Sequence, residues 1–194
     1  MPDETRERIL ETAMGLFARR GFAKTTMNDI VRESRLSKGG VYWYFSSKDE
    51  IVNAIFDQFF ESQIAVLRAI LAEQEQTATG KLIQLARLEG GDAESLLTQF
   101  PSSLEFYALA ARETALLPRL QHYFSFYREA IQTLVAQGIN SGEWVNANAI
   151  ETADTIITMF EGTVLIWSIV PDAFRLSAQL EASVSLLLNG LNKA

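Results

Sequence analysis

The sequence predicts an all-α fold of about nine helices, with a small N-terminal three-helix domain followed by a larger C-terminal helical domain. Two observations lead to this prediction. Apolar residues recur at the three-to-four spacing of a helix face along almost the whole chain of 194 residues. No two segments read as a pair of strands. Hydrophobic residues make up 48% of the chain, which is typical of a folded globular protein.

The expected helices follow from start and stop signals along the chain. They are placed at about 4–20, 27–34, a short helix capped by Ser37, then 48–74, 81–89, 101–114, 118–138, 148–170 and 174–192. Gly21 follows a basic last turn and ends the first helix. The pairs Thr26–Asp29 and Ser47–Glu50 have the spacing of capping boxes, which predicts helix starts there.

Later boundaries depend on glycine and proline. Gly90 and Gly91 are expected to end the helix that begins near residue 81. Pro101 and Pro118 suit the first turns of helices, and Pro171 interrupts the penultimate one. The five-residue stretch VYWYF at 41–45 favours a strand by propensity alone, but no partner strand lies nearby, so we expect a helix there.

Composition excludes several kinds of protein. There are no cysteines, which excludes disulfides, thiol catalysis and cysteine-ligated zinc. The most apolar stretch, TVLIWSIV at 163–170, is far shorter than the ~20 residues of a membrane span. The polar start MPDETRER lacks the apolar centre of a signal peptide. We therefore expect a cytoplasmic protein that does not enter a membrane.

Charge is unevenly distributed along the chain. The net charge is −7, yet residues 19–48 hold seven Lys or Arg against two Asp or Glu, a local charge of +5. A basic segment on an acidic chain suits a polyanionic partner, although chance scatter produces the same pattern.

The segment SKGGVYWYFSSKDE at 37–50 carries the functional signal. Two short helices joined by a tight turn, after a longer helix, form a helix-turn-helix, whose second helix reads the DNA major groove. Glycines there permit close approach, while Tyr and Trp can contact thymine methyl groups and phosphate. Lys48, in the first turn of the next helix, can meet a phosphate.

The same region carries a family pattern. It comprises Gly21–Phe22, a Thr-rich cap before a helix with Ile30 inward, Ser-x-Gly-x-x-Tyr-x-x-Phe (Ser37, Gly39, Tyr42, Phe45), and Ser-Lys-acid (Ser47, Lys48, Asp49). This pattern spans about a quarter of the chain and resembles the DNA-binding domain of TetR/AcrR-type transcriptional regulators. One departure is Arg35, which stands where the family usually has a turn glycine. If φ is positive there, a side chain costs on the order of 1 kcal/mol; Arg35 can alternatively add a phosphate contact.

The resemblance implies a homodimer that binds a pseudo-palindromic double-stranded DNA operator. It implies a DNA-binding domain at 1–47 that extends into the fourth helix to about 63, and a regulatory, ligand-binding and dimerisation domain at 64–194. The base-reading positions would be Lys38, Gly39, Gly40, Tyr42 and Trp43. The phosphate contacts would be Thr25, Thr26, Tyr44 and Lys48, with Phe45 in the core and Tyr44 alternatively half in the core.

Aromatic residues gather in the second half of the chain. Seven of the eleven that follow residue 63 lie within 100–127. They form either an ordinary helix-bundle core or the lining of an apolar ligand cavity. The candidates for ligand binding are Phe60, Phe100, Phe106, Tyr107, Tyr123, Phe124, Tyr127, Phe160 and Trp167. His122, the only histidine, has no partner at metal-ligand spacing, so no metal or cofactor is predicted.

The last two helices are apolar on more than one face, which indicates burial on most sides and, in a chain of this size, contact with a second copy. The candidate interface residues are Ile156, Phe160, Val164, Val184, Leu187, Leu188 and Leu191.

These observations predict a sequence-specific DNA-binding transcriptional regulator. The resemblance implies a repressor that is released from its operator by a small molecule, and the aromatic residues suggest an apolar or aromatic one. No P-loop, Rossmann glycine pattern or catalytic His set is present, so an enzyme is not expected. The alternatives are a helical partner-binding adaptor, or an enzyme using carboxylates such as Glu151, Asp154 and Glu161, neither of which would bind DNA.

Overall fold

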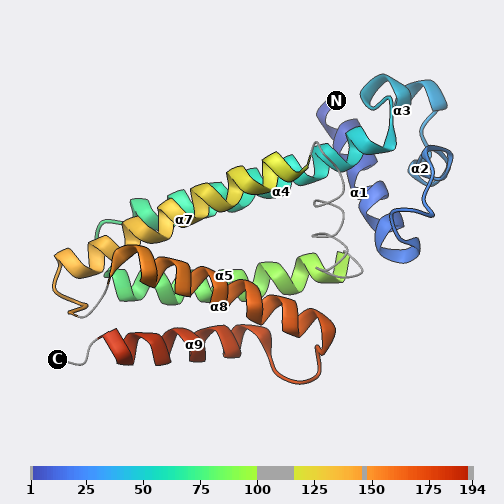
Figure 1. The fold of residues 1–194 in the computed structure, drawn as a ribbon. Coiled ribbons are helices and arrows are strands. Elements are labelled where there is room, and N and C mark those ends of the chain that lie inside the picture. The colour runs from blue at the N-terminus through green and yellow to red at the C-terminus, as the bar shows by residue number, and fades with distance from the viewer. Residues whose placement is uncertain (1, 100–115, 146–147, 192–194) are drawn as a thin grey trace. The chain divides into compact units, whose positions relative to one another are not determined.

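The computed structural model describes residues 2–99, 116–145 and 148–191, and every regular element within these ranges is a helix (Figure 1). The helices are α1 (Pro2–Arg20), α2 (Met27–Ser34), α3 (Lys38–Tyr44), α4 (Lys48–Ala72), α5 (Ala78–Gln99), α7 (Leu117–Asn140), α8 (Ala149–Ile169) and α9 (Leu176–Leu191). The all-α prediction is confirmed. The helix expected over 101–114 lies outside the described residues.

The chain divides into two compact units. The first contains α1 to α3 and α4 as far as Glu61, together with the described residues of Leu96–Arg119. The second contains the rest of α4, most of α5 and α7, and all of α8 and α9. Since α4 is one unbroken helix of 25 residues, it contributes side chains to both units.

The core of the first unit is built around one apolar face of α1. Its buried hydrophobic side chains include Ile9, Leu10, Ala13, Leu16, Phe17, Ile30, Val41, Phe45, Ile51, Val52, Ile55, Phe56 and Phe60. Within α3, Val41 is the buried hydrophobic residue, and Phe45 just after the helix is buried as well. Tyr42 and Trp43 of the VYWYF stretch are exposed, so these two rings can meet a partner.

The second unit has a continuous apolar core. Buried residues of α4, α5, α7, α8 and α9 contact one another in it, among them Leu67, Leu82, Tyr127, Ile156, Phe160, Leu180 and Val184. Glu143, in the link after α7, accepts hydrogen bonds from the backbone N–H groups of Ala78 (3.0 Å) and Thr79 (2.9 Å). These are among the N–H groups that the first turn of a helix leaves unpaired, so the link caps α5.

The predicted end of α5 at Gly90 and Gly91 is wrong, because the helix continues to Gln99. A Cβ atom placed on Gly90 would lie 2.7 Å from the Cα atom of Ser177, just inside the start of α9. Glycine is needed there because α5 and α9 pack closely at this point, and it does not stop the helix.

Among the described residues, no helix combines the length and the apolar character that a membrane crossing needs.

Candidate nucleic-acid interface

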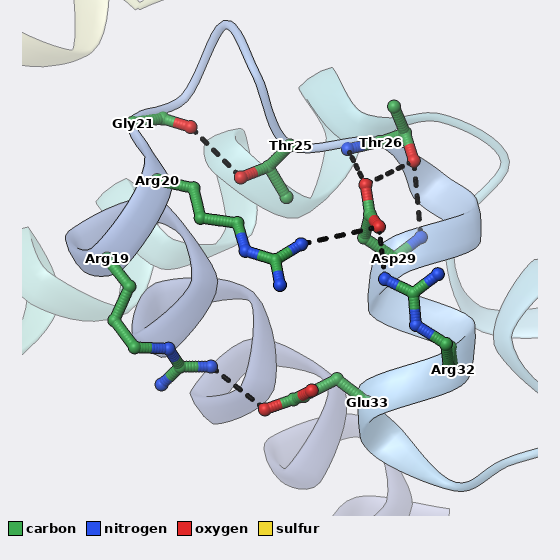
Figure 2. A network of polar contacts seen from close by, with 8 residues as sticks. All are labelled: Arg19, Arg20, Gly21, Thr25, Thr26, Asp29, Arg32 and Glu33. Carbon is green, nitrogen blue, oxygen red and sulfur yellow. Dashed lines mark hydrogen bonds and ion pairs between the residues drawn. The ribbon is translucent and has the colours of Figure 1, made fainter.

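A network of polar contacts shapes the start of α2 (Figure 2). Thr26 is the N-cap residue: its hydroxyl oxygen accepts from the backbone N–H of Asp29 at 3.2 Å, and the Asp29 carboxylate accepts from the backbone N–H of Thr26 at 3.0 Å. The predicted capping box is thus confirmed. Arg20 of α1 and Arg32 of α2 form ion pairs with the same carboxylate.

The charge of Asp29 is strongly favoured by this network. Hydrogen bonds from the hydroxyl and then the backbone N–H of Thr26, followed by Arg32, lower the pKa of Asp29 from 3.8 to about 2. Asp29 therefore remains an anion at any ordinary pH, and it joins the end of α1 to the first turn of α2. Sequence reasoning found the capping box but missed Arg20 as a partner, since nine residues and a turn separate the two in the chain.

The turn between α2 and α3 contains a left-handed residue. Arg35 has φ 56° and ψ 27° and caps the C-terminus of α2. The positive φ that the missing glycine suggested is thus present, and the side chain of Arg35 is exposed. Two residues later Ser37 caps α3, with its hydroxyl oxygen accepting from the backbone N–H of Gly40 at 3.0 Å.

The outward side of α3 carries the residues expected to read bases. Trp43 is 74% exposed and Tyr42 is 39% exposed, whereas Val41 of the same helix is fully buried. The ammonium group of Lys38 lies 5.6 Å from the centre of the Tyr42 ring. A Cβ atom on Gly39 would meet no atom within 4 Å, so a partner can approach the backbone closely there.

Tyr44 and Phe45 lie deeper. Phe45 is 5% exposed, as a core residue should be. Tyr44 is half-buried, and its ring packs edge-on against Trp43 with the ring centres 4.5 Å apart. Tyr44 therefore supports Trp43, and its contact with phosphate stays a prediction.

Two of the predicted phosphate contacts are already engaged inside the protein. Thr25 is 1% exposed, and its hydroxyl donates to the carbonyl oxygen of Gly21 at 2.9 Å (Figure 2), so its side chain is not open to DNA in this structure. The ammonium group of Lys48 donates to the carbonyl oxygens of Phe22 (2.8 Å) and Thr25 (3.0 Å). These contacts join residues more than twenty positions apart, which spacing along the sequence does not reveal.

The aromatic residues predicted to bind a ligand are mostly core residues where they are described. Phe60 belongs to the first unit, while Tyr123, Tyr127 and Phe160 are buried in the second. Phe124 and Trp167 pack partly exposed against the core of the second unit. Phe100, Phe106 and Tyr107 lie outside the described residues.

Tyr127 has the least ordinary environment of this set. Its ring stacks on that of Tyr123, with centres 5.8 Å apart, and its buried hydroxyl lies near the side chain of Glu89. Burial raises the pKa of Tyr127 well above its usual value, and the nearby Glu89, Tyr123 and Glu161 raise it further. The phenol therefore stays protonated, able to exchange a hydrogen bond with a bound molecule.

Most of the residues predicted for the dimer interface are buried within the single chain, and their contact with a second copy stays a prediction. Exposed fractions do not exceed 8% for Ile156, Phe160, Val184, Leu188 and Leu191, which belong to the core of the second unit. Val164 and Leu187 are only partly buried. Exposed apolar residues of α8 and α9 lie elsewhere on the same helices: Ile150, Ile166, Ile169 and Leu186.

The geometry of α1 to α3 defines a class of protein: a helix-turn-helix DNA-binding protein with exposed aromatic residues on its second helix. Comparison with known proteins agrees. The family described as "Bacterial regulatory proteins, tetR family" matches residues 9–55. An uncharacterized HTH-type transcriptional regulator, YfiR of Bacillus subtilis (strain 168), is 30% identical over 163 residues, 84% of this chain and 79% of that protein. The chain belongs to the TetR family of DNA-binding transcriptional regulators.

A further curated protein and a solved structure are also similar to this chain. A probable acrEF/envCD operon repressor of Escherichia coli (strain K12) is 30% identical over 136 residues, which cover 70% of this chain and 54% of that protein. The crystal structure of a putative transcriptional regulator from Saccharomonospora viridis in complex with choline has a TM-score of 0.79 at 20% identity. It covers 96% of both chains, and this likeness shows the shared fold.

Proposed function

We propose that this chain is a homodimeric repressor that binds a pseudo-palindromic operator and leaves it when a small apolar or aromatic molecule binds the second unit. The observation that carries operator reading is the outward pair Tyr42 and Trp43 on a glycine-rich helix within the helix-turn-helix. Lys38, Gly39 and Gly40, at the N-terminal end of that helix, would lie at the base edges, with Thr26 and Tyr44 at phosphates.

The buried hydroxyl of Tyr127 supports a ligand site. It lies near the side chains of Glu89 and Glu161, and a few polar groups within an apolar core are typical of a small-molecule site. The stacked rings of Tyr123 and Tyr127 supply apolar surface for such a molecule. Because the choline-bound neighbour shares only the fold, it supports a small-molecule site in general and leaves the identity of the ligand to experiment.

Exposed apolar and small residues on α8 and α9 support the dimer. Ile166 is 54% exposed, Ile169 is 59% exposed and Leu186 is 73% exposed. Gly162 and Gly190 would accept a Cβ atom without meeting any atom within 4 Å, so a second copy could approach these helices closely. Large exposed apolar side chains beside open backbone are typical of an interface.

The function can be tested with the wild-type protein and an uncharged aromatic probe, N-phenyl-1-naphthylamine. A DNA duplex selected by the protein from a random pool serves as operator, and fluorescence anisotropy measures its affinity. We expect the probe to weaken operator binding by about 5- to 150-fold, and operator to weaken probe binding by the same factor. A probe that binds in the second unit while operator affinity stays unchanged would contradict ligand release, but not DNA binding.

A further inference from the structure

The ammonium group of Lys48 lies within a set of three internal partners. Lys48 is the first residue of α4, and its Nζ atom donates to the carbonyl oxygens of Phe22 at 2.8 Å and Thr25 at 3.0 Å. It also lies 4.0 Å from the centre of the Phe22 ring, the distance of a close cation–π contact. All three partners belong to the loop that joins α1 to α2.

These contacts use most of what an ammonium group can offer. It has three N–H donors, and two of them are engaged by backbone carbonyls while the ring covers another side. Turning the group toward a DNA phosphate would leave both carbonyl oxygens without this partner and remove the cation from the ring. A phosphate role, which the position of Lys48 in the sequence suggested, therefore competes with an arrangement already made inside the protein.

The loop held by Lys48 leads directly into the DNA-binding helices. Thr25 is followed by Thr26, the N-cap residue of α2, whose backbone N–H is bound to Asp29. The loop is also held at its other end, where the ring of Phe22 packs edge-on against Phe17 of α1 with centres 5.4 Å apart. A displacement of the start of α4 would thus be passed to the start of α2 through one side chain.

We propose that Lys48 is a positioning residue, which fastens the α1–α2 loop to the first turn of α4 and so sets the placement of α2 for operator binding. It acts on the operator through the loop and does not neutralise a phosphate. The inference rests on operator binding, which is part of the proposed function. Lys48 is then the residue through which a movement of α4 would reach the helix-turn-helix.

The test compares Lys48→Met, Lys48→Arg and the control Lys38→Met, which removes an exposed cation from α3. Affinity for the selected duplex is measured as a function of salt concentration. For Lys48→Met we expect roughly tenfold weaker binding, as two carbonyl groups lose their partner, with the salt dependence of the wild type. Loss of one phosphate contact per protomer would instead lower the log–log salt slope by roughly 2 per dimer. Lys38→Met, at a position assigned to the base edges, should change which duplex is preferred. Lys48→Arg should fail to restore affinity, because a planar guanidinium does not reproduce the compact ammonium.

Amide hydrogen exchange supplies a second measurement. In Lys48→Met, exchange should quicken in residues 22–30, the loop and the first turn of α2, and stay unchanged in α7 and α8. This local pattern separates positioning from general unfolding, and thermal melting checks that the variant is folded.

Three results would overturn the proposal: a salt slope lowered by roughly 2 per dimer in Lys48→Met, wild-type affinity in Lys48→Arg, or no loss of affinity in Lys48→Met. Failure of the proposed function looks different, because the wild-type protein itself would then select no duplex from the pool.

Discussion

Arg35 occupies a backbone conformation that suits glycine, with φ 56°. A residue with a Cβ atom costs roughly 1–2 kcal/mol in this region, partly offset because glycine has more freedom in the unfolded chain. Arg35→Gly should therefore raise the free energy of unfolding by about 0.5–1 kcal/mol, measured by urea denaturation.

Arg35→Ala is the matched control, because it keeps the Cβ atom and should gain nothing. An alanine variant more stable than the glycine variant would contradict the strain argument. If both variants bind operator with a lower salt slope, the guanidinium of Arg35 also contacts phosphate.

Asp29 links stability to acid pH. Its pKa is lowered to about 2 by hydrogen bonds from Thr26 and by Arg32, against 3.8 for the unfolded chain. A lowered pKa in the folded state gives stability that is complete above the unfolded value and is lost as pH falls toward 2. Between pH 5 and pH 2, the wild type should thus lose more stability than Asp29→Asn, in which the amide oxygen can still accept from Thr26. Thermal melting measures the loss of stability in both proteins. Equal losses in the wild type and in Asp29→Asn would contradict this role.

Trp43 offers a test of base reading that leaves the fold intact. Because its side chain is 74% exposed, Trp43→Ala should hardly change thermal stability. Operator preference should change instead, by about 1–3 kcal/mol per half-site for the bases it contacts. The measurement is selection from a random DNA pool. Uniform loss of affinity on every duplex would show that the ring supports Tyr44 and reads nothing.

At the scale of elements, α5 and α9 illustrate how packing decides the role of a glycine. Gly90→Ala should destabilise the protein although alanine favours helix by about 1 kcal/mol, since the new Cβ atom would lie 2.7 Å from the backbone of Ser177. Gly91→Ala is the control: no atom lies within 4 Å of its Cβ position, so it should stabilise. Denaturation of both variants measures the difference, and two stabilised variants would contradict the close packing.

Helix positions could be predicted where local signals agree. The spacing of Thr26 and Asp29 predicts the start of α2. Asn148 caps the start of α8 in the same local way, since its side chain accepts from two N–H groups of the first turn. The end of α5 could not be predicted, because glycine is both a helix stop and a means of close approach. Only the helix packed against Gly90 distinguishes the two.

At the scale of the whole molecule, the proposed dimer can be tested by introducing charge on α9. Leu186→Glu places a carboxylate where an exposed leucine would be buried against a second copy. We expect a monomer by analytical ultracentrifugation, and operator affinity lowered because one protein then meets one half-site.

Leu88→Glu, on α5, is the matched control, since Leu88 is also an exposed leucine and lies outside α8 and α9. It should leave both the association state and operator affinity unchanged. A dimeric Leu186→Glu variant would contradict the proposed interface, whatever its effect on DNA.

The sequence by itself determined the fold class and the helix-turn-helix, and it predicted which residues of α3 would read bases. These depend on local rules: helical periodicity, capping residues and a fixed spacing of glycine, tyrosine and phenylalanine. Tertiary structure decided what each candidate side chain does. Val184 and Leu188 are core residues, whereas Leu186 is exposed. Thr25 is buried, and Lys48 donates to carbonyl groups more than twenty residues away. Burial and long-range hydrogen bonds form only when separate segments come into contact, and residue spacing in the sequence does not show which segments do so.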